Sequence, residues 1–242
     1  LSLLGKDHYE LKKWEKFLNH LSEPERTTAI ALIGKYVELK DSYISIAESL
    51  IHSGSKNKTK VNLHWMHSSK IRDDNYANLL KGLDGIIVAP GFGSRAIEGK
   101  ILAVKHARVN NIPFLGICLG MQMAVIEFAR NVVNLQNANS TEMDISTKHP
   151  VITLMENQID VDQKGGTMRL GSWKCKIEKN TLAKKIYKKE VIAERHRHRY
   201  EVNNNLIIKI NANNISNFEH DEIHPYFIRY NNFIKFINNS FF

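Results

Sequence analysis

The segment IPFLGICLGMQMAVIEFARN, residues 112–131, constrains the fold more than any other part of this chain. An apolar run leads into GICLG, where Cys118 stands between Gly116 and Gly120, and a helix-like segment follows at once. A glycine on each side of a nucleophile, at a switch from strand to helix, is typical of an elbow that lifts one side chain above a sheet. The pattern therefore predicts a strand, a sharp turn at Cys118, and a helix.

The same alternation extends over much of the chain. From Thr28 onward, short apolar runs (TAIALIG, KVNLHWM, GLDGIIVAPGFG) alternate with helix-like segments (DSYISIAESLIHSG, EGKILAVKHARVNN). This order favours an α/β fold with a mostly parallel central sheet and helices on both faces. After Glu142 the regularity weakens, and HPVITLM, GGTMRLGSWKCKI, EVIAERHRHRYEV and NLIIKINAN indicate a small antiparallel extension.

Cys118 is the predicted nucleophile. A cysteine at a helix N-terminus is exposed to unpaired N–H groups and to the helix dipole, which favour the reactive thiolate. The alternative is an inert cysteine at the end of a core strand. Acyl chemistry also needs donors for an oxyanion, and we expect them from the amides of Leu119 and of Gly91, whose lack of a side chain leaves room for a substrate carbonyl.

Composition excludes several other classes of protein. With 242 residues and 43% hydrophobic content the chain can bury a core, and no apolar run reaches membrane-spanning length. The first residues lack a secretory signal, so we expect a cytoplasmic protein. Cys118 and Cys175 are far apart, which argues against a cysteine metal site. The net charge of +9 comes from lysines spread along the chain, which favours an anionic nucleotide or an acidic partner over nucleic acid.

Four motifs in order, GICLGMQ, NANSTE, GGTMRLG and ERHRHRYEVNN, resemble the glutamine amidotransferase domain of CTP synthases, within the class I triad amidotransferases. The resemblance extends from about Ile33 to about Asn204 and implies the flavodoxin-like fold of these domains. We expect an amidotransferase domain over 28–242. Residues 1–27 are expected to form a helix and linker, loosely similar to the family's inter-domain connector.

The resemblance implies that L-glutamine is hydrolysed at Cys118 through a thioester. Ammonia would then pass to a synthetase domain that aminates ATP-activated UTP to CTP; that domain, with its ATP, UTP and Mg, is not in this chain, and no cofactor is expected in this one. Glu142 and Arg199 match the positions that grip the amino acid end of glutamine, as a carboxylate and a guanidinium can. The full set of implied substrate-binding residues is Gly91, Phe92, Leu119, Gly120, Met121, Gln122, Glu142 and Arg199.

The family's catalytic QFHPEF segment, which supplies the triad His and Glu, does not occur in this sequence. On one alignment HPYFI precedes a deleted segment, and both residues are lost. On another, His224 is the base and Tyr226 stands where the Glu belongs. A catalytically silent module that docks on the synthetase is therefore the alternative function.

Two further regions leave questions of ligand binding open. The loop before GGTMRLG is shorter than in the family, where this region helps GTP stimulate glutamine hydrolysis, so GTP activation does not carry over with the resemblance. The alternation in RHRHR places His196 and His198 on one face of a strand and the arginines on the other. Two histidines without a third ligand make a poor zinc site, and we expect no metal.

Overall fold

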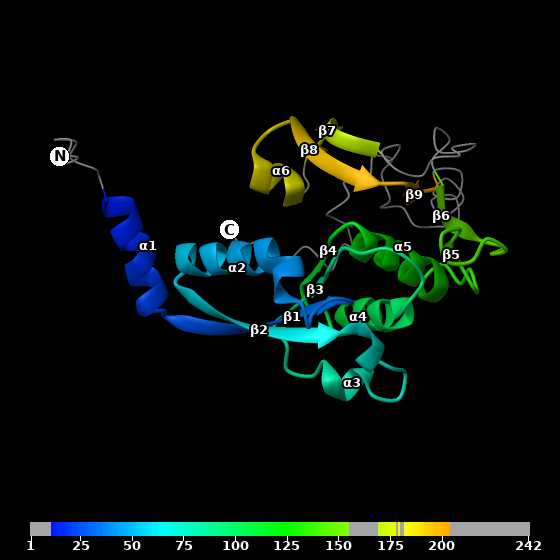
Figure 1. Cartoon of the computed structure of the whole chain (residues 1–242), viewed down its shortest axis with the longest axis horizontal. Helices are drawn as coiled ribbons and strands as arrows, with labels where there is room; N and C mark the ends of the chain where they lie inside the picture. The colour runs from blue at the N-terminus through cyan, green and yellow to red at the C-terminus, as the bar shows by residue number, and fades with distance from the viewer. Residues whose placement is uncertain (1–10, 155–168, 178, 180–181, 204–242) are drawn as a thin grey trace.

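The computed structural model describes residues 11–154, 169–177, 179 and 182–203 (Figure 1). Its central sheet has four parallel strands in the order β2-β1-β3-β4. These strands are β1 (Arg26–Gly34), β2 (Thr59–His67), β3 (Gly85–Val88) and β4 (Phe114–Gly116). The helical segments around them are η1 (Lys40–Tyr43), α2 (Ile44–Lys56), η2 (Ser68–Lys70), α3 (Tyr76–Leu79), α4 (Ile97–Val109) and α5 (Leu119–Asn131). The predicted alternation of strand and helix is confirmed; η2 and α3 were not predicted.

Strand β1 is buried on both faces, because successive side chains of a strand point in opposite directions. Ala31 and Ile33 belong to the core that α4 and α5 cover. Ile30 and Leu32 belong to a second core, on the other face, that η1 and α2 cover. Helices therefore pack on both faces of the parallel sheet, as the sequence predicted.

The second half of the described chain forms two smaller sheets. Strands β5 (Asn139–Ser140), β6 (Pro150–Leu154) and β9 (Tyr200–Val202) make one of them, with β5 parallel and β9 antiparallel to β6. Strands β7 (Arg169–Lys176) and β8 (Val191–His198) make an antiparallel pair, with α6 (Leu182–Tyr187) between them in sequence. The antiparallel extension is thus confirmed, except that β5 pairs in parallel. The strand predicted from NLIIKINAN lies outside the described residues.

An N-terminal helix, α1 (Lys12–Ser22), projects from one end of the molecule (Figure 1). Two hydrogen bonds join it to α2, since the Ser55 hydroxyl donates to the Phe17 carbonyl at 2.9 Å and the His20 ring contacts the Ser55 carbonyl at 2.9 Å. The predicted helix before residue 27 is confirmed. The division of the chain at that point stays a prediction. Within the described residues, no helix combines the length and apolarity needed to cross a membrane.

A buried ion pair holds α4 against α5. The Glu127 side chain has no exposed surface, and its carboxylate accepts from Arg108 Nε at 2.9 Å and from Arg108 Nη2 at 2.7 Å. Such a two-pronged contact fixes both distance and orientation. Because α5 begins directly after Cys118 and α4 follows the loop that carries Gly91, this pair contributes to the geometry between those two parts of the chain.

Candidate active site

Cys118 lies on a strained turn between β4 and α5. Its backbone has φ 54° and ψ −106°, a conformation that residues with a Cβ rarely adopt. Both flanking glycines are required by packing. An ideal Cβ on Gly120 would lie 2.1 Å from the Val88 carbonyl oxygen, and one on Gly116 would lie 2.6 Å from the Gly120 carbonyl carbon. The predicted elbow is therefore present, and its glycines permit the turn to pack against the end of β3.

The ionisation of Cys118 depends on opposing effects. Burial raises the pKa of the half-buried thiol above its ordinary value, and the charge of Glu142 raises it further. The Leu119 N–H, which donates to the sulfur, and the charge of Lys100 lower the pKa, but burial prevails. The sequence argument for a ready thiolate considered only the helix terminus, because burial of the elbow depends on the tertiary structure.

The two predicted oxyanion donors, the amides of Gly91 and Leu119, belong to different segments that lie close together. An ideal Cβ on Gly91 would lie 3.5 Å from Cδ2 of Leu119, so the loop after β3 lies next to the start of α5. The Leu119 N–H already points at the Cys118 sulfur. An oxyanion hole built from both residues requires such closeness, and their roles as donors stay predictions.

The loop after β3 is held by two charged side chains. The Lys35 ammonium donates to the carbonyl oxygens of Phe92 at 2.6 Å and of Gly93 at 2.5 Å. The Gly93 N–H donates to Glu142 Oε1 at 2.7 Å. Because the C=O and N–H of a trans peptide point in opposite directions, Lys35 and Glu142 hold the Phe92–Gly93 peptide from its two sides.

A hydrogen bond from Gln122 joins the elbow helix to the strand that follows Arg199. The buried Gln122 side chain donates through Nε2 to the Tyr200 carbonyl at 2.9 Å, and its backbone N–H donates to the Cys118 carbonyl at 3.1 Å. This brings Tyr200, and with it the neighbouring Arg199, to the first turn of α5. In this structure Gln122 therefore acts as a tether, and its predicted contact with substrate stays a prediction.

Comparison with known proteins decides the family. The model of the family described as glutamine amidotransferase class-I matches residues 38–234, most of the chain. The chain belongs to the class I glutamine amidotransferases. The elbow at Cys118 therefore belongs to an amidotransferase domain, and the roles of Cys118, Leu119 and Gly91 in catalysis stay predictions.

The related sequences show which members of the family this amidotransferase resembles. It is 57% identical over 204 residues to the CTP synthase of Flavobacterium johnsoniae and 53% identical over 195 residues to that of Bacillus subtilis. These matches cover 84% and 81% of this chain but only 38% and 36% of the relatives, so the chain spans less than two fifths of their length. It is homologous to their glutamine amidotransferase part.

A solved structure also relates this chain to the CTP synthases. The glutaminase domain of Trypanosoma brucei CTPS, with bound acivicin, matches with a TM-score of 0.69 and 38% sequence identity. The match covers 77% of this chain and 72% of that one. The central parallel sheet with helices on both faces is therefore the fold of a CTP synthase glutaminase domain.

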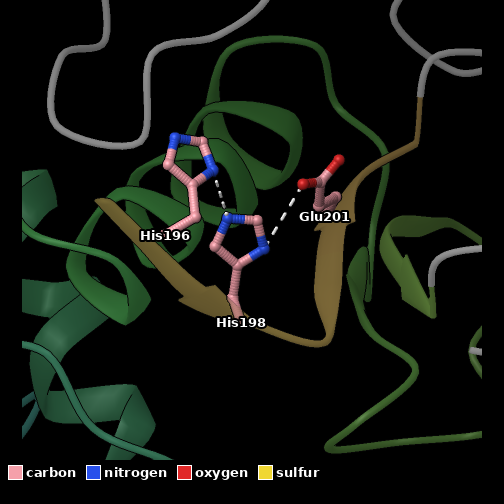
Figure 2. A group of neighbouring side chains, drawn as sticks. All are labelled: His196, His198 and Glu201. Carbon is pink, nitrogen blue, oxygen red and sulfur yellow. Dashed lines mark hydrogen bonds and ion pairs between the residues drawn. The ribbon is translucent and has the colours of Figure 1, made fainter. Parts of the chain in front are cut away.

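His196 and His198 of RHRHR lie on one face of β8, as the alternation of the sequence predicted. Figure 2 shows the carboxylate of Glu201 beside them. His198 Nε2 lies 3.0 Å from His196 Nδ1, and His198 Nδ1 lies 3.3 Å from Glu201 Oε1. Possible ligand atoms of the three residues all lie within 4.8 Å of one another. The sequence did not indicate Glu201 as a neighbour of the two histidines, because its position depends on how β9 folds back after β8. A hydrogen bond joins His196 to His198, and an ion-pair contact joins His198 to Glu201, so the three side chains link β8 to β9 next to Arg199.

The remaining predicted residues of the amidotransferase site have mixed outcomes. Leu119, Gly120 and Met121 are buried in the first turn of α5, so any contact with substrate comes from their backbone. The side chain of Phe92 is 55% exposed, and its carbonyl is bound by Lys35. His224 lies outside the described residues, so its role stays a prediction.

Sequence reasoning missed two lysines of this site. Lys35 and Lys100 are buried, with 3% and 0% of their surface exposed. Lysines are rarely buried to this extent, and the sequence alone indicates an exposed cation at each position. The available signal was position, since Lys35 follows the β1 run directly and Lys100 belongs to EGKI at the start of an apolar helix.

Proposed function

We propose that this chain hydrolyses L-glutamine to glutamate and ammonia through a thioester on Cys118. The observation that carries the proposal is the elbow, which holds the sulfur beside the Leu119 N–H and places the Leu119 side chain next to Gly91. This arrangement suits acyl transfer, in which a nucleophile attacks a carbonyl and backbone donors bind the negative oxygen that forms.

The chemistry runs in two halves. The Cys118 thiolate attacks the side-chain carboxamide carbon, and the resulting oxyanion is bound by the Leu119 and Gly91 amides. Collapse of this intermediate breaks the carbon–nitrogen bond; the leaving nitrogen takes up a proton and departs as ammonia. Water then cleaves the thioester to glutamate and restores the thiol. Both proton transfers call for an acid–base group, for which His224 is the proposed residue.

We further propose that the ammonia is used by a CTP synthase synthetase domain, in the cytoplasm. Support comes from the relatives, which are named CTP synthases and are longer than this chain. ATP, UTP and Mg would belong to that domain, and no activation by GTP is part of this proposal. Neither a nucleic acid nor a membrane has a part in this proposal.

A second function is favoured by one specific observation. The sequence lacks QFHPEF, so the base and its carboxylate are either replaced or lost. A chain without them would keep the fold and dock on its synthetase as a silent module. In that case Cys118 could still react with an electrophile, because a cysteine depends on a base less than other nucleophiles do.

Acivicin separates these two functions, because it is the ligand bound to the related Trypanosoma brucei glutaminase domain. The protein is incubated with acivicin and examined by mass spectrometry, in parallel with an assay of glutamate release. An adduct on Cys118 together with turnover supports glutamine hydrolysis. An adduct without turnover indicates a silent module whose Cys118 still reacts with a bound ligand. The absence of both adduct and turnover contradicts the proposed function.

The Glu142→Gln variant tests the proposed grip on the amino group of glutamine. The amide oxygen can still accept from the Gly93 N–H, so the loop keeps its hydrogen bond while the negative charge is lost. Loss of one charge-assisted hydrogen bond, worth about 1.5 kcal/mol, is expected to raise KM for glutamine about tenfold, with a smaller change in kcat. Steady-state kinetics measure both constants, and thermal unfolding checks that stability is retained. An unchanged KM would remove Glu142 from the substrate site.

A further inference from the structure

Three potential metal ligands lie together where β8 ends, and the proposed hydrolysis of glutamine does not use them. Possible ligand atoms of His196, His198 and Glu201 all lie within 4.8 Å of one another (Figure 2). The two histidines share one face of β8, and Glu201 comes from β9. The expectation of no metal rested on the lack of a third ligand, which Glu201 supplies.

The spacing of these groups is close to that of ligands around a single ion. In a tetrahedral zinc site with bonds of about 2.1 Å, neighbouring ligand atoms lie about 3.4 Å apart. His198 Nε2 lies 3.0 Å from His196 Nδ1, and His198 Nδ1 lies 3.3 Å from Glu201 Oε1. His198 thus points one ring nitrogen at each neighbour, whereas an ion takes only one of them. Binding therefore requires a change in the orientation of this ring, which the broad terminal torsion of histidine permits.

Burial and charge also suit a bound cation. The side chain of His198 is 11% exposed and that of Glu201 is 34% exposed, so the imidazole is shielded from water while the carboxylate stays accessible. Arg195 and Arg197 alternate with the histidines along β8 and are exposed. Because successive side chains of a strand point in opposite directions, these two positive charges lie on the other face of β8.

We propose that His196, His198 and Glu201 bind a divalent transition-metal ion, for which Zn²⁺ is the best fit. Imidazole nitrogens suit Zn²⁺, whereas Mg²⁺ and Ca²⁺ prefer oxygen ligands. Two histidines and a glutamate are a known zinc ligand set, in which the fourth position is left to water. The ion joins the end of β8 to β9 and braces the turn that contains Arg199. This inference does not depend on the proposed function.

Binding is tested with zinc alone. The metal-free protein is titrated with Zn²⁺ in the presence of a chromophoric chelator as competitor, and we expect one ion per chain that Mg²⁺ does not displace. The same titration of Cys118→Ser removes the thiol as a competing ligand and should give the same result. A chain that binds no zinc, binds it only through Cys118, or releases it to Mg²⁺ would overturn the proposal.

Two variants locate the ion. His198→Gln and Glu201→Gln each remove one ligand and keep a polar side chain of comparable size. Each should weaken zinc binding at least about a hundredfold, because losing a group that merely supports a ligand already costs about ten- to a hundredfold. The matched control is His64→Gln, the same change at an exposed histidine of β2, whose zinc affinity should equal that of the unmodified protein. Tight binding that survives both ligand substitutions would place the ion elsewhere and contradict the proposal.

A further measurement needs no variant and so covers the case in which these substitutions prevent folding. The ring signals of the histidines are assigned and followed by NMR while zinc is added to the unmodified protein. The signals of His196 and His198 should change together and reach their end point at one equivalent of zinc. A response confined to other histidines, or no response at all, would show that this cluster does not bind the ion.

Discussion

Replacing Cys118 with alanine is expected to abolish both activities of the site, glutamate release and adduct formation with acivicin. The loss in glutamate release should be at least about a thousandfold, because no other group can form the thioester and the oxyanion donors act only once a bond to carbon has begun to form. The small alanine side chain fits the same turn, so the fold should persist. Coupled detection of glutamate and intact-protein mass spectrometry measure the two effects.

The second cysteine of the chain provides the control. Cys175 is buried in a small apolar cluster with Ile177 and Ile192, away from the elbow in sequence and in fold. Cys175→Ala should therefore retain glutamate release and a single acivicin adduct. If Cys118→Ala hydrolysed glutamine as fast as the unmodified chain, the activity would reside elsewhere and the thioester mechanism would fail.

Replacing Gly120 with alanine is expected to destabilise the chain by about 3 kcal/mol, the upper part of the range for inserting a group into a packed interior. The new Cβ would lie 2.1 Å from the Val88 carbonyl oxygen and 2.9 Å from the Val88 carbonyl carbon, and these backbone atoms cannot turn aside as a flexible side chain would. Alanine in place of glycine normally stabilises a helix by up to about 1 kcal/mol, so the direction of the change is informative. Urea unfolding measures it.

Gly91→Ala is the matched control for stability. Its Cβ would have its nearest neighbours at 3.5 to 4.0 Å, which is ordinary contact, so the unfolding free energy should change by less than about 0.5 kcal/mol. The two substitutions add the same methyl group on either side of the oxyanion site. Equal stability of Gly120→Ala and the unmodified chain would mean that the elbow can move away from β3, contrary to the close packing described above.

The local pattern of the sequence was enough to predict the elbow and the layers around it. A strand buried on both faces needs apolar residues in succession, and a tight turn between strand and helix needs small flanking residues. Both requirements fall on neighbouring positions, so they can be read in TAIALIG and in GICLG. For the same reason the pairing of Gly91 with Leu119 as oxyanion donors could be expected, because parallel strands end at the same edge of the sheet.

Other features depend on contacts between distant segments, which no local pattern encodes. Lys100 is buried because α4 packs its first turns against the end of β3, where the lysine donates to the Ala89 carbonyl. The Gln122 tether and the approach of Glu201 to His198 arise where β9 returns to α5 and β8. The ionisation of Cys118 belongs to the same group. The helix terminus that favours its thiolate was evident in the sequence, but the burial that opposes it comes from the tertiary structure, because desolvation depends on everything that surrounds the sulfur.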